Sequence, residues 1–380
     1  MSSKIAFVEE ASQPDANIAA LCRKHGISRP TGYEALRRFK KDGYAGLEEL
    51  SRRPKSTPLA TAEDIVAAIV EARAKHPRWG AKKLVVVLRR KFGELTPSVR
   101  TVHRVLERFG QIRARRKRRP LSVVDKAPTV AASKPNDVWT IDFKGWWRTQ
   151  DGNRCDPLTI RDAYSRYVLA LVLVPRCTTE NVRTIMERLF RQHGVPQAIH
   201  CDNGPPFISV QAAGGLSMLS AWWVALGIQV LRSRPGCPQD NGAHERMHVD
   251  VAGDLQTDPA VSVELQQRAC DKWKQTFNHV RPHEALGNKT PAELYKSAPS
   301  KKPLERVPAY PLDWLKRKVT KNGSVTVGFD SAFVSTALRG YFVGLQPLPG
   351  VRYRVWFYEL AICEVEIANL DEEQVHQLVG

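Results

Sequence analysis

The sequence predicts a multidomain protein in which α-helical units come first, a mixed α/β domain follows, and a small β-barrel comes last. Three observations predict this order. Apolar residues recur at helical spacing up to about residue 109, strand-like segments alternate with helices from residue 138, and apolar and polar residues alternate from about residue 310. A chain of 380 residues has room for two to four domains.

Composition limits the possible functions. The longest clean apolar run, Val168–Val174, is far shorter than the roughly 20 residues of a membrane span, and the first residues lack the apolar core of a secretory signal. The seven cysteines are scattered and form no Cys-x-x-Cys pair, which disfavours a disulfide framework and a zinc ribbon. We therefore expect no membrane partner and a reducing, cytoplasmic location.

Basic charge is concentrated in the first third of the chain. Residues 1–120 contain 28 basic and 12 acidic side chains, whereas the remaining 260 residues contain 30 and 27. A basic surface kept only for solubility would be spread more evenly. This distribution therefore favours a polyanionic partner such as nucleic acid.

The first segment, residues 1–50, is predicted to be a helix-turn-helix domain. A short helix over 17–25 ends at Gly26, which can adopt the left-handed conformation common at helix C-termini. Ser28 can cap a second helix over 29–40, whose basic residues suit the DNA major groove. The candidate DNA contacts on this helix are Arg29, Arg37 and Arg38. A generic helical hairpin is the alternative interpretation.

Residues 61–112 are predicted to form a second DNA-binding unit of the helix-turn-helix type. Its helices are expected over Glu63–Lys75, Ala81–Phe92 and Val99–Phe109, the last capped by Ser98. Three arginines recur every four residues on one face of the third helix: Arg100, Arg104 and Arg108. Such a face is typical of a recognition helix, and a solvated helix face is the alternative.

A basic linker is predicted over residues 113–136. Six of its first seven residues are basic, and such a run cannot bury itself, so we expect it to lie along DNA phosphates. These residues are Arg113, Arg115, Arg116, Lys117, Arg118 and Arg119. The prolines that follow mark a domain boundary.

Residues 137–298 have the pattern of a mixed α/β sheet covered by helices on both faces. The expected strands are 139–143, 155–162, 167–174, 197–201 and 228–231. The expected helices are 180–193, 216–226, 241–256 and 263–278. Residues 310–370 follow as the small β-barrel, with five alternating segments and a hairpin turn signal at Asn322-Gly323.

Three acidic residues carry the candidate chemistry of the α/β domain. Asp142 lies in an apolar strand, and Asp202 follows the fourth strand, at the carboxyl end where α/β sheets commonly bind ligands. Glu245 lies early in the helix that begins near Asn241, and its spacing with Val249 predicts that it faces the sheet. For any one of these acids alone, a capping or surface role would be the better interpretation.

Two strand-borne acids and one helix-borne acid can together hold a divalent cation. Carboxylate oxygens are hard ligands that suit Mg²⁺ or Mn²⁺. Without a cation, three converging carboxylates would raise one another's pKa, whereas a bound metal would keep them ionised. The sequence therefore predicts a metal site formed by these acids.

Four ordered motifs surround the acids and extend beyond them. They are Trp139-Thr-Ile-Asp142, Cys201-Asp202-Asn203-Gly204-Pro-Pro-Phe207, Pro238-Gln239-Asp240-Asn241-Gly242-Ala-His-Glu245-Arg246 and Phe277-Asn278-His-Val-Arg281-Pro282-His283. Together they resemble the catalytic core of the retroviral-integrase superfamily and, more closely, bacterial insertion-sequence transposases with an integrase-type DDE core. The resemblance is clearest over 137–295. The 42 residues between Asp202 and Glu245 are more than is usual in the family, and the excess fits an insertion near 208–215.

The resemblance implies an RNase H-like catalytic core in which Asp142, Asp202 and Glu245 are both the catalytic residues and the ligands of two Mg²⁺ ions, with Mn²⁺ able to substitute. The residues expected to shape the active-site loops are Asn203, Gly204, Gln239, Asn241 and Gly242. The candidate phosphate contacts, chosen for their proximity in sequence, are Lys144, Arg232, Arg234 and Arg246.

The implied function is that of a bacterial, nucleoid-associated DNA transposase. It would bind the terminal repeats of a mobile element in double-stranded DNA, cleave phosphodiester bonds at its ends and join the 3′-OH ends to target DNA by two-metal-ion transesterification. A homo-oligomer is expected, because two ends must be joined in one synaptic complex. A catalytically idle DNA-binding regulator would be expected to lack at least one acid, and a plain nuclease would need neither two helix-turn-helix units nor the basic linker.

Overall fold

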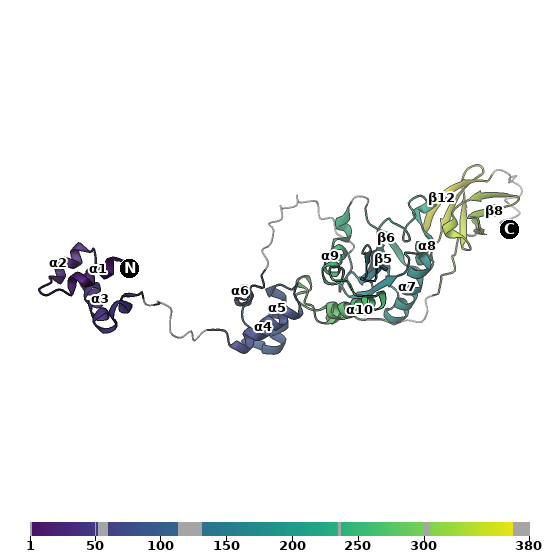
Figure 1. Cartoon of the computed structure of the whole chain (residues 1–380). Helices are drawn as coiled ribbons and strands as arrows, with labels where there is room; N and C mark the ends of the chain where they lie inside the picture. Colours follow the sequence, from purple (N-terminus) through teal and green to yellow (C-terminus); the bar gives the residue numbers. More distant parts are fainter. Residues whose placement is uncertain are drawn as a thin grey trace. The chain divides into compact units, whose positions relative to one another are not determined.

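The computed structural model describes residues 2–49, 51, 60–112, 131–234, 237–299 and 304–367. These residues belong to two compact units, Met1–Ala62 and Glu63–Gly380 (Figure 1). The predicted DNA contacts of the basic linker lie outside the described residues: Arg113, Arg115, Arg116, Lys117, Arg118 and Arg119.

The described part of the first unit consists of helices around a small core. The helices are α1 (Ser2–Ala11), α2 (Ile18–Lys24) and α3 (Arg29–Asp42). The Ser28 hydroxyl accepts the Thr31 N–H at 3.3 Å, and Gly26 has the positive φ of +63° that closes α2. The predicted helix pair is therefore confirmed. The sequence interpretation missed α1, which contributes the fully buried Phe7 and Val8 to the core.

The second unit begins with the predicted three-helix segment. Its helices are α4 (Glu63–Lys75), α5 (Ala81–Phe92) and α6 (Val99–Arg108). Ile69, Leu84 and Leu106 are fully buried between them. The Ser98 hydroxyl accepts the Thr101 N–H at 3.2 Å and caps α6 as predicted. Apolar residues at helical spacing thus direct one face of each helix inward.

A mixed sheet forms the centre of the second unit. Its strands are β1 (Val138–Phe143), β2 (Trp147–Arg148), β3 (Arg154–Asp162), β4 (Val168–Val174), β5 (Ala198–Cys201) and β6 (Gln229–Arg232). The order is β2-β3-β1-β5-β6, with β4 paired to β3. Strands β1, β5 and β6 are parallel neighbours, so their carboxyl ends meet at one edge of the sheet.

Helices cover both faces of this sheet (Figure 1). They are α7 (Thr179–His193), α8 (Met218–Ala225), α9 (Gly242–Val251), α10 (Val263–His279) and the short α11 (Pro291–Leu294). Helices α7 and α8 pack against β1 and β5 around Trp139 and Trp223, whereas α9 and α10 pack against β3 and β4 around Met247. A π-helical turn, Ala252–Gln256, follows α9.

The last segment is antiparallel β structure. Its strands are β7 (Leu315–Lys318), β8 (Ser324–Val327), β9 (Asp330–Phe333), β10 (Phe342–Pro347), β11 (Arg352–Phe357) and β12 (Leu360–Glu366). They form a four-stranded sheet, β12-β11-β10-β7, and a hairpin, β8-β9. The sequence interpretation missed β7. The core of this sheet includes Ala221 and Val224 of α8 together with Leu216, which follows the predicted insertion.

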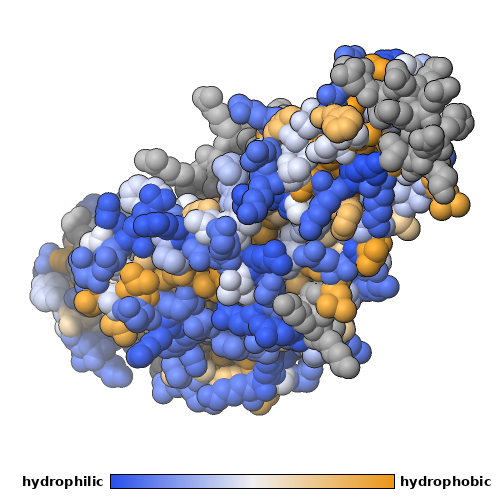
Figure 2. All heavy atoms as spheres, turned by 90° about the vertical axis from the view of Figure 1, so that its right-hand side faces the viewer, coloured by the Kyte–Doolittle hydropathy of each residue, from blue (hydrophilic) through white to orange (hydrophobic). Residues whose placement is uncertain are grey.

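No helix in the described part of the chain is long and apolar enough to cross a membrane. The face drawn in Figure 2 is mostly hydrophilic, with apolar side chains in small patches.

Candidate active site

The strand register brings two of the predicted acids to the same edge of the sheet. Thr140 of β1 pairs with His200 of β5 in the parallel ladder. Asp142 and Asp202 each lie two residues further along, so both lie on the same face of the sheet as that pair. This is the carboxyl-end position that the sequence predicts for Asp202.

The electrostatics of Asp142 show that the third acid lies nearby. The pKa of Asp142 is raised to about 7, first by burial, next by the negative charge of Asp202, and also by that of Glu245. The backbone N–H of Phe143 and the charge of Lys144 oppose this rise. The structure therefore gathers Asp142, Asp202 and Glu245 into one electrostatic group.

The predicted orientation of Glu245 is wrong. The buried residues of α9 include His244, Met247, His248 and Val251, whereas Glu245 is exposed and Val249 is half exposed. The reason is that α9 presents its two histidines to polar residues of the sheet, which places Glu245 on the solvent side of the helix. Glu245 therefore lies at the rim of the site rather than beneath the helix.

Two histidines and two threonines form a buried network behind Asp142. The Thr159 hydroxyl lies 2.6 Å from His244 Nε2 and 2.7 Å from His248 Nε2, and it donates to the Asp142 carbonyl at 2.9 Å. His244 Nδ1 also lies 2.8 Å from the Thr140 hydroxyl. Because the network joins β1, β3 and α9, it fixes the helix that carries Glu245 against the strand that carries Asp142.

Burial keeps these two histidines neutral. It lowers the pKa of His248 to about 3, and it holds the pKa of His244 well below its usual value. His248 Nδ1 lies 3.9 Å from Asp142 Oδ2. The sequence interpretation missed this pair, although two histidines four residues apart on one helix were a readable signal.

The predicted loop residues lie around the acids. Asn241 Nδ2 donates to Asp142 Oδ2 at 3.1 Å, and the Gly204 N–H donates to Asp202 Oδ1 at 3.2 Å. Asn203 Nδ2 donates to the Ser233 carbonyl at 2.7 Å. Gly242 is the first residue of α9. Gln239 lies in the 3₁₀ turn Pro238–Asn241, and its side chain is outside the described part of the structure.

The predicted phosphate contacts near the acids are mostly engaged within the protein. Arg234 forms a two-pronged ion pair with Asp240, at 2.7 and 3.0 Å, which raises the pKa of Arg234 and lowers that of Asp240 to about 2. Arg232 donates to the Gly214 carbonyl at 2.7 Å. Arg246 lies 3.4 Å from Asp250, and Lys144 is half-buried beside Asp142.

The predicted DNA contacts of the helical units differ in their surroundings. Arg37 pairs with Glu34 at 2.8 Å, Arg38 donates to the Glu48 carbonyl at 2.5 Å, and Arg29 is exposed. On α6 the three arginines of the predicted face are exposed: Arg100, Arg104 and Arg108. Among the described residues, no ion pair involves any of these three α6 side chains.

The acids have the donor chemistry for a divalent cation. Within the described residues, no group of three or more His, Cys, Asp or Glu side chains is arranged to hold a metal ion. Asp202 and Glu245 are exposed, however, and can turn toward Asp142. The raised pKa of Asp142 reflects an excess of negative charge that a cation would neutralise. The residues present therefore fit a metal site, although their side chains are not gathered around one.

Comparisons with known proteins show what the core is similar to. Residues 132–238 and 226–291 match two models described as integrase core domain. Residues 3–55 match a helix-turn-helix domain, and residues 31–106 match a homeodomain-like domain. The chain is therefore similar to integrase core domains over 132–291 and to helix-turn-helix domains over its first part.

Curated relatives come from bacterial insertion elements. The chain is 26% identical over 277 residues to the uncharacterized 39.2 kDa protein of insertion element IS476 from Xanthomonas euvesicatoria, covering 72% of this chain and 76% of that protein. It is 25% identical over 233 residues to the uncharacterized 31.7 kDa protein of IS407 from Burkholderia multivorans, covering 61% and 80%. These matches confirm the resemblance to insertion-element proteins with an integrase core.

Solved structures also match. The HTLV-2 integrase catalytic core domain in complex with magnesium is 18% identical, with a TM-score of 0.31, over 43% of this chain and 98% of that one. A simian T-cell lymphotropic virus intasome in complex with PP2A regulatory subunit B56 gamma is 17% identical, with a TM-score of 0.37, over 78% and 99%.

Proposed function

We propose that this protein is the DNA transposase of an insertion element. It binds the element's terminal repeats, cleaves phosphodiester bonds at the ends, and joins the freed 3′-OH ends to target DNA. The observation that carries the proposal is the position of Asp142 and Asp202 at the carboxyl ends of two neighbouring parallel strands, in a region that matches an integrase core domain. The raised pKa of Asp142, caused by burial and by the charges of Asp202 and Glu245, supports it. Three carboxylates whose charges act on one another in a core of this class support metal-dependent phosphoryl transfer.

In this proposal Asp142, Asp202 and Glu245 hold divalent metal at the edge of the sheet. When bound there, two Mg²⁺ ions, or Mn²⁺ in their place, supply the Lewis acidity for in-line displacement at the scissile phosphate. Asn241 orients the Asp142 carboxylate through its 3.1 Å hydrogen bond. Because His244 and His248 are neutral, they add no positive charge beside Asp142 that would compete with a metal for its carboxylate.

The helical units and a second copy of the chain complete the proposal. The two helix-turn-helix matches and the exposed α6 arginines support contacts to double-stranded DNA. Phosphate contacts by Arg100, Arg104 and Arg108 would position the DNA without reading its sequence. Two element ends must be joined in one event, so we expect a homo-oligomeric synaptic complex.

A cleavage and strand-transfer assay tests the proposal. The substrate is a duplex of the terminal repeat that flanks the coding sequence, with Mg²⁺ or Mn²⁺. Glu245→Gln keeps the size of the side chain and removes its charge, and Glu180→Gln makes the same change at an exposed position of α7. We expect wild type and Glu180→Gln to cut and join DNA, and Glu245→Gln to bind DNA without doing either.

The same assay can contradict the proposal. If wild type binds the ends but neither cuts nor joins them with either metal, the protein is better described as a DNA-binding regulator that keeps the integrase core. If it cuts DNA but never joins ends, the function is that of a nuclease.

A further inference from the structure

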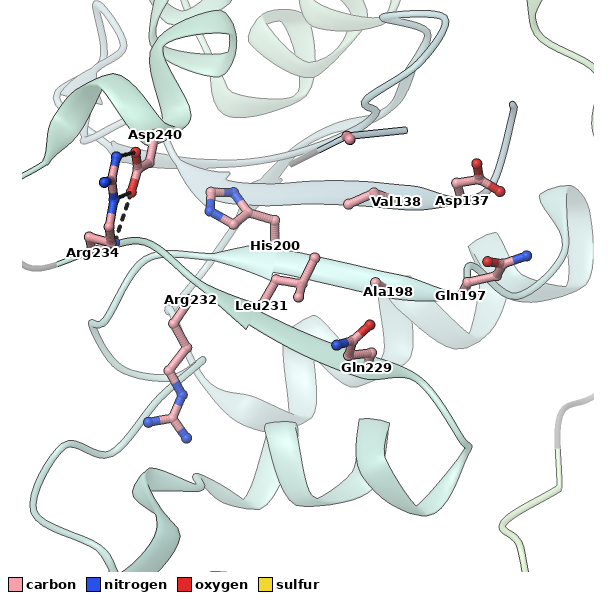
Figure 3. Close-up of a pocket in the computed structure, with 11 residues that line it drawn as sticks. Asp137, Val138, Gln197, Ala198, His200, Gln229, Leu231, Arg232, Arg234 and Asp240 are labelled. Atoms are coloured by element: carbon pink, nitrogen blue, oxygen red, sulfur yellow. Dashed lines mark hydrogen bonds and ion pairs between the residues drawn. The ribbon is translucent and has the colours of Figure 1, made fainter. Parts of the chain in front are cut away.

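A polar cleft lies on the sheet over strands β1, β5 and β6 (Figure 3). Its volume is about 490 Å³, which is within the range of sites for small organic groups. Strands β1, β5 and β6 form its apolar floor, with Val138, Ala198 and Leu231. Gln229 and His200 add hydrogen-bonding groups. A flat apolar floor with a few polar groups suits a planar heterocyclic ligand.

Two buried polar atoms of the cleft have no hydrogen-bond partner within the described residues. His200 is 3% exposed, and its Nδ1 is one of these atoms. Its other ring nitrogen, Nε2, lies 3.3 Å from the Ser233 hydroxyl. Asp137 Oδ1 is the second atom, whereas Asp137 Oδ2 accepts bonds from Ser133 and Lys134. Both atoms are almost inaccessible in the unbound protein. Buried polar atoms without partners are costly, so a ligand that they reach after a turn of the side chain would gain affinity.

Strand β5 connects the cleft to Asp202, because His200 lines the cleft and Asp202 directly follows the end of this strand. His200 lies in β5, and Asp202 is two residues further along, just after the strand ends, which is a separation of about 6.6 Å at the rise of an extended chain. Ser233 touches both regions, because its hydroxyl faces His200 and its carbonyl accepts the Asn203 amide. The rise of DNA is about 3.4 Å per nucleotide of one strand. A group in the cleft would therefore belong to a nucleotide within about two positions of a phosphate at the acids.

The charges of the cleft disfavour a phosphate as the ligand. Asp137 and Asp240 both line it, and the two-pronged pair with Asp240 already compensates the charge of Arg234. Arg232 is bonded to the Gly214 carbonyl. A neutral group with both donors and acceptors fits better, and a nucleobase has that character at its edge.

We propose that this cleft receives one unpaired base of the element's DNA, next to the scissile phosphate, with His200 Nδ1 bonding its edge. The inference rests on the proposed function, because it requires DNA at the acids. Taking a base out of a duplex costs a few kcal/mol of stacking and pairing. Contacts in the cleft offset that cost and hold the cleavage site open.

Fluorescence of 2-aminopurine tests the inference without requiring catalysis. Terminal-repeat duplexes carry this base analogue at single positions around the cleavage site, and they are bound by the full chain in EDTA, where no cutting is needed. Its emission rises when the base leaves the stack. His200→Ala and Gln229→Leu alter the cleft, and Gln192→Leu is the matched control on the exposed side of α7.

We expect the emission to rise at one position in wild type and Gln192→Leu, and the rise to be lost in both cleft variants, although a mobility shift shows that they still bind. With Mg²⁺ we expect His200→Ala to cut about fivefold more slowly, which is equivalent to one neutral hydrogen bond of about 1 kcal/mol. An abasic site at that position should remove the difference between His200→Ala and wild type.

Two results would overturn the inference. One is a stable complex with no rise in emission at any position. The other is a rise that persists unchanged in both cleft variants, because the base would then be held elsewhere. Either result leaves the proposed function standing if wild type still cuts and joins DNA. Conversely, a base that enters the cleft of a protein that never cuts would contradict the proposed function alone.

Discussion

Helices α6 and α9 both carry charged residues at helical spacing, but they use charge in opposite ways. On α6 the arginines face solvent, and the buried face is formed by Val102, Val105 and Leu106. On α9 the buried face includes His244, His248 and Asp250. One helix keeps charge away from its core, whereas the other places titratable groups within it.

The difference separates arginines that are bonded within the protein from arginines that are exposed. Three arginines form bonds with residues of α9. Arg161 donates to the Ala243 carbonyl at 2.7 Å, and Arg246 and Arg281 both form ion pairs with Asp250. The α6 arginines have no comparable task among the described residues. The sequence analysis proposed DNA contacts both for Arg246 of α9 and for the arginines of α6. Only the contacts in the structure distinguish the two groups.

The largest loss of folding stability is expected from Arg281→Leu. Arg281 pairs with Asp250 at 2.5 Å, and both side chains are at most 10% exposed. Removing the arginine leaves a buried carboxylate without its main partner, which typically costs about 3–5 kcal/mol of the free energy of unfolding. Denaturant unfolding of the full chain, monitored by circular dichroism, measures this loss.

Arg246→Leu is the matched control, because Arg246 contacts the same carboxylate from a side chain that is 65% exposed. Its cost should be no more than about 1 kcal/mol. Leucine at both 281 and 250 should recover much of the lost stability. Equal losses in the two single variants would mean that α9 does not depend on buried charge.

The second largest effect on stability is expected from Asp142→Asn. In the absence of metal this variant should be more stable than wild type at high pH, by up to about 4 kcal/mol of the free energy of unfolding. The folded protein holds this carboxyl at a pKa of about 7, above its ordinary value of 3.8, so the folded state binds the proton more tightly. Wild type should therefore lose stability relative to the variant as pH rises from about 4 to about 7, with a constant difference above that range. Thermal unfolding of both proteins at several pH values in EDTA measures this difference in stability.

Asp258→Asn, an exposed change after the π-helical turn, should show no such trend. Added Mg²⁺ should stabilise wild type at pH 8 and leave Asp142→Asn unchanged, because only the ionised carboxylate binds the ion. A wild type whose stability relative to the variant is the same at pH 5 and pH 8 would contradict the gathering of the three acids.

Local pattern was sufficient to predict most elements and the position of the acids. Helices such as α5 and α6 bury apolar residues at helical spacing, and β5 is followed directly by the Asn203-Gly204 turn, so each is visible in a short window of sequence. Asp202 was predicted because its strand ends where the Asn203-Gly204 turn begins, and Asp142 because it is an acid within an apolar strand.

What the sequence did not predict depends on distant partners. The burial of His244 and His248 requires Thr159, which is brought to β1 only by the antiparallel pairing of β3. That pairing, and not the apolar periodicity of α9, decides that Glu245 faces solvent. Strand β7 was missed because Leu315–Lys318 is mostly basic, and it is a strand through its pairing with β10.

The smallest effect on folding stability is expected when Arg100, Arg104 and Arg108 are all replaced with alanine. The same variant should have a clear effect on DNA binding. All three are exposed, so the free energy of unfolding should change little. If each contacts one phosphate, the slope of log affinity against log salt should fall by about 0.9 per lost contact, or about 2.7 in total. Fluorescence anisotropy with a terminal-repeat duplex at several salt concentrations measures the slope.

The control removes the same charge from elsewhere in the second unit, by alanine at the exposed Arg188, Arg191 and Lys272. If the α6 face contacts DNA, only the α6 variant should change the slope. An unchanged slope in the α6 variant would mean that this face is merely solvated, as the alternative interpretation of the sequence allowed. The contrast between α6 and α9 would then concern folding alone, because exposure of an arginine would not by itself identify a DNA contact.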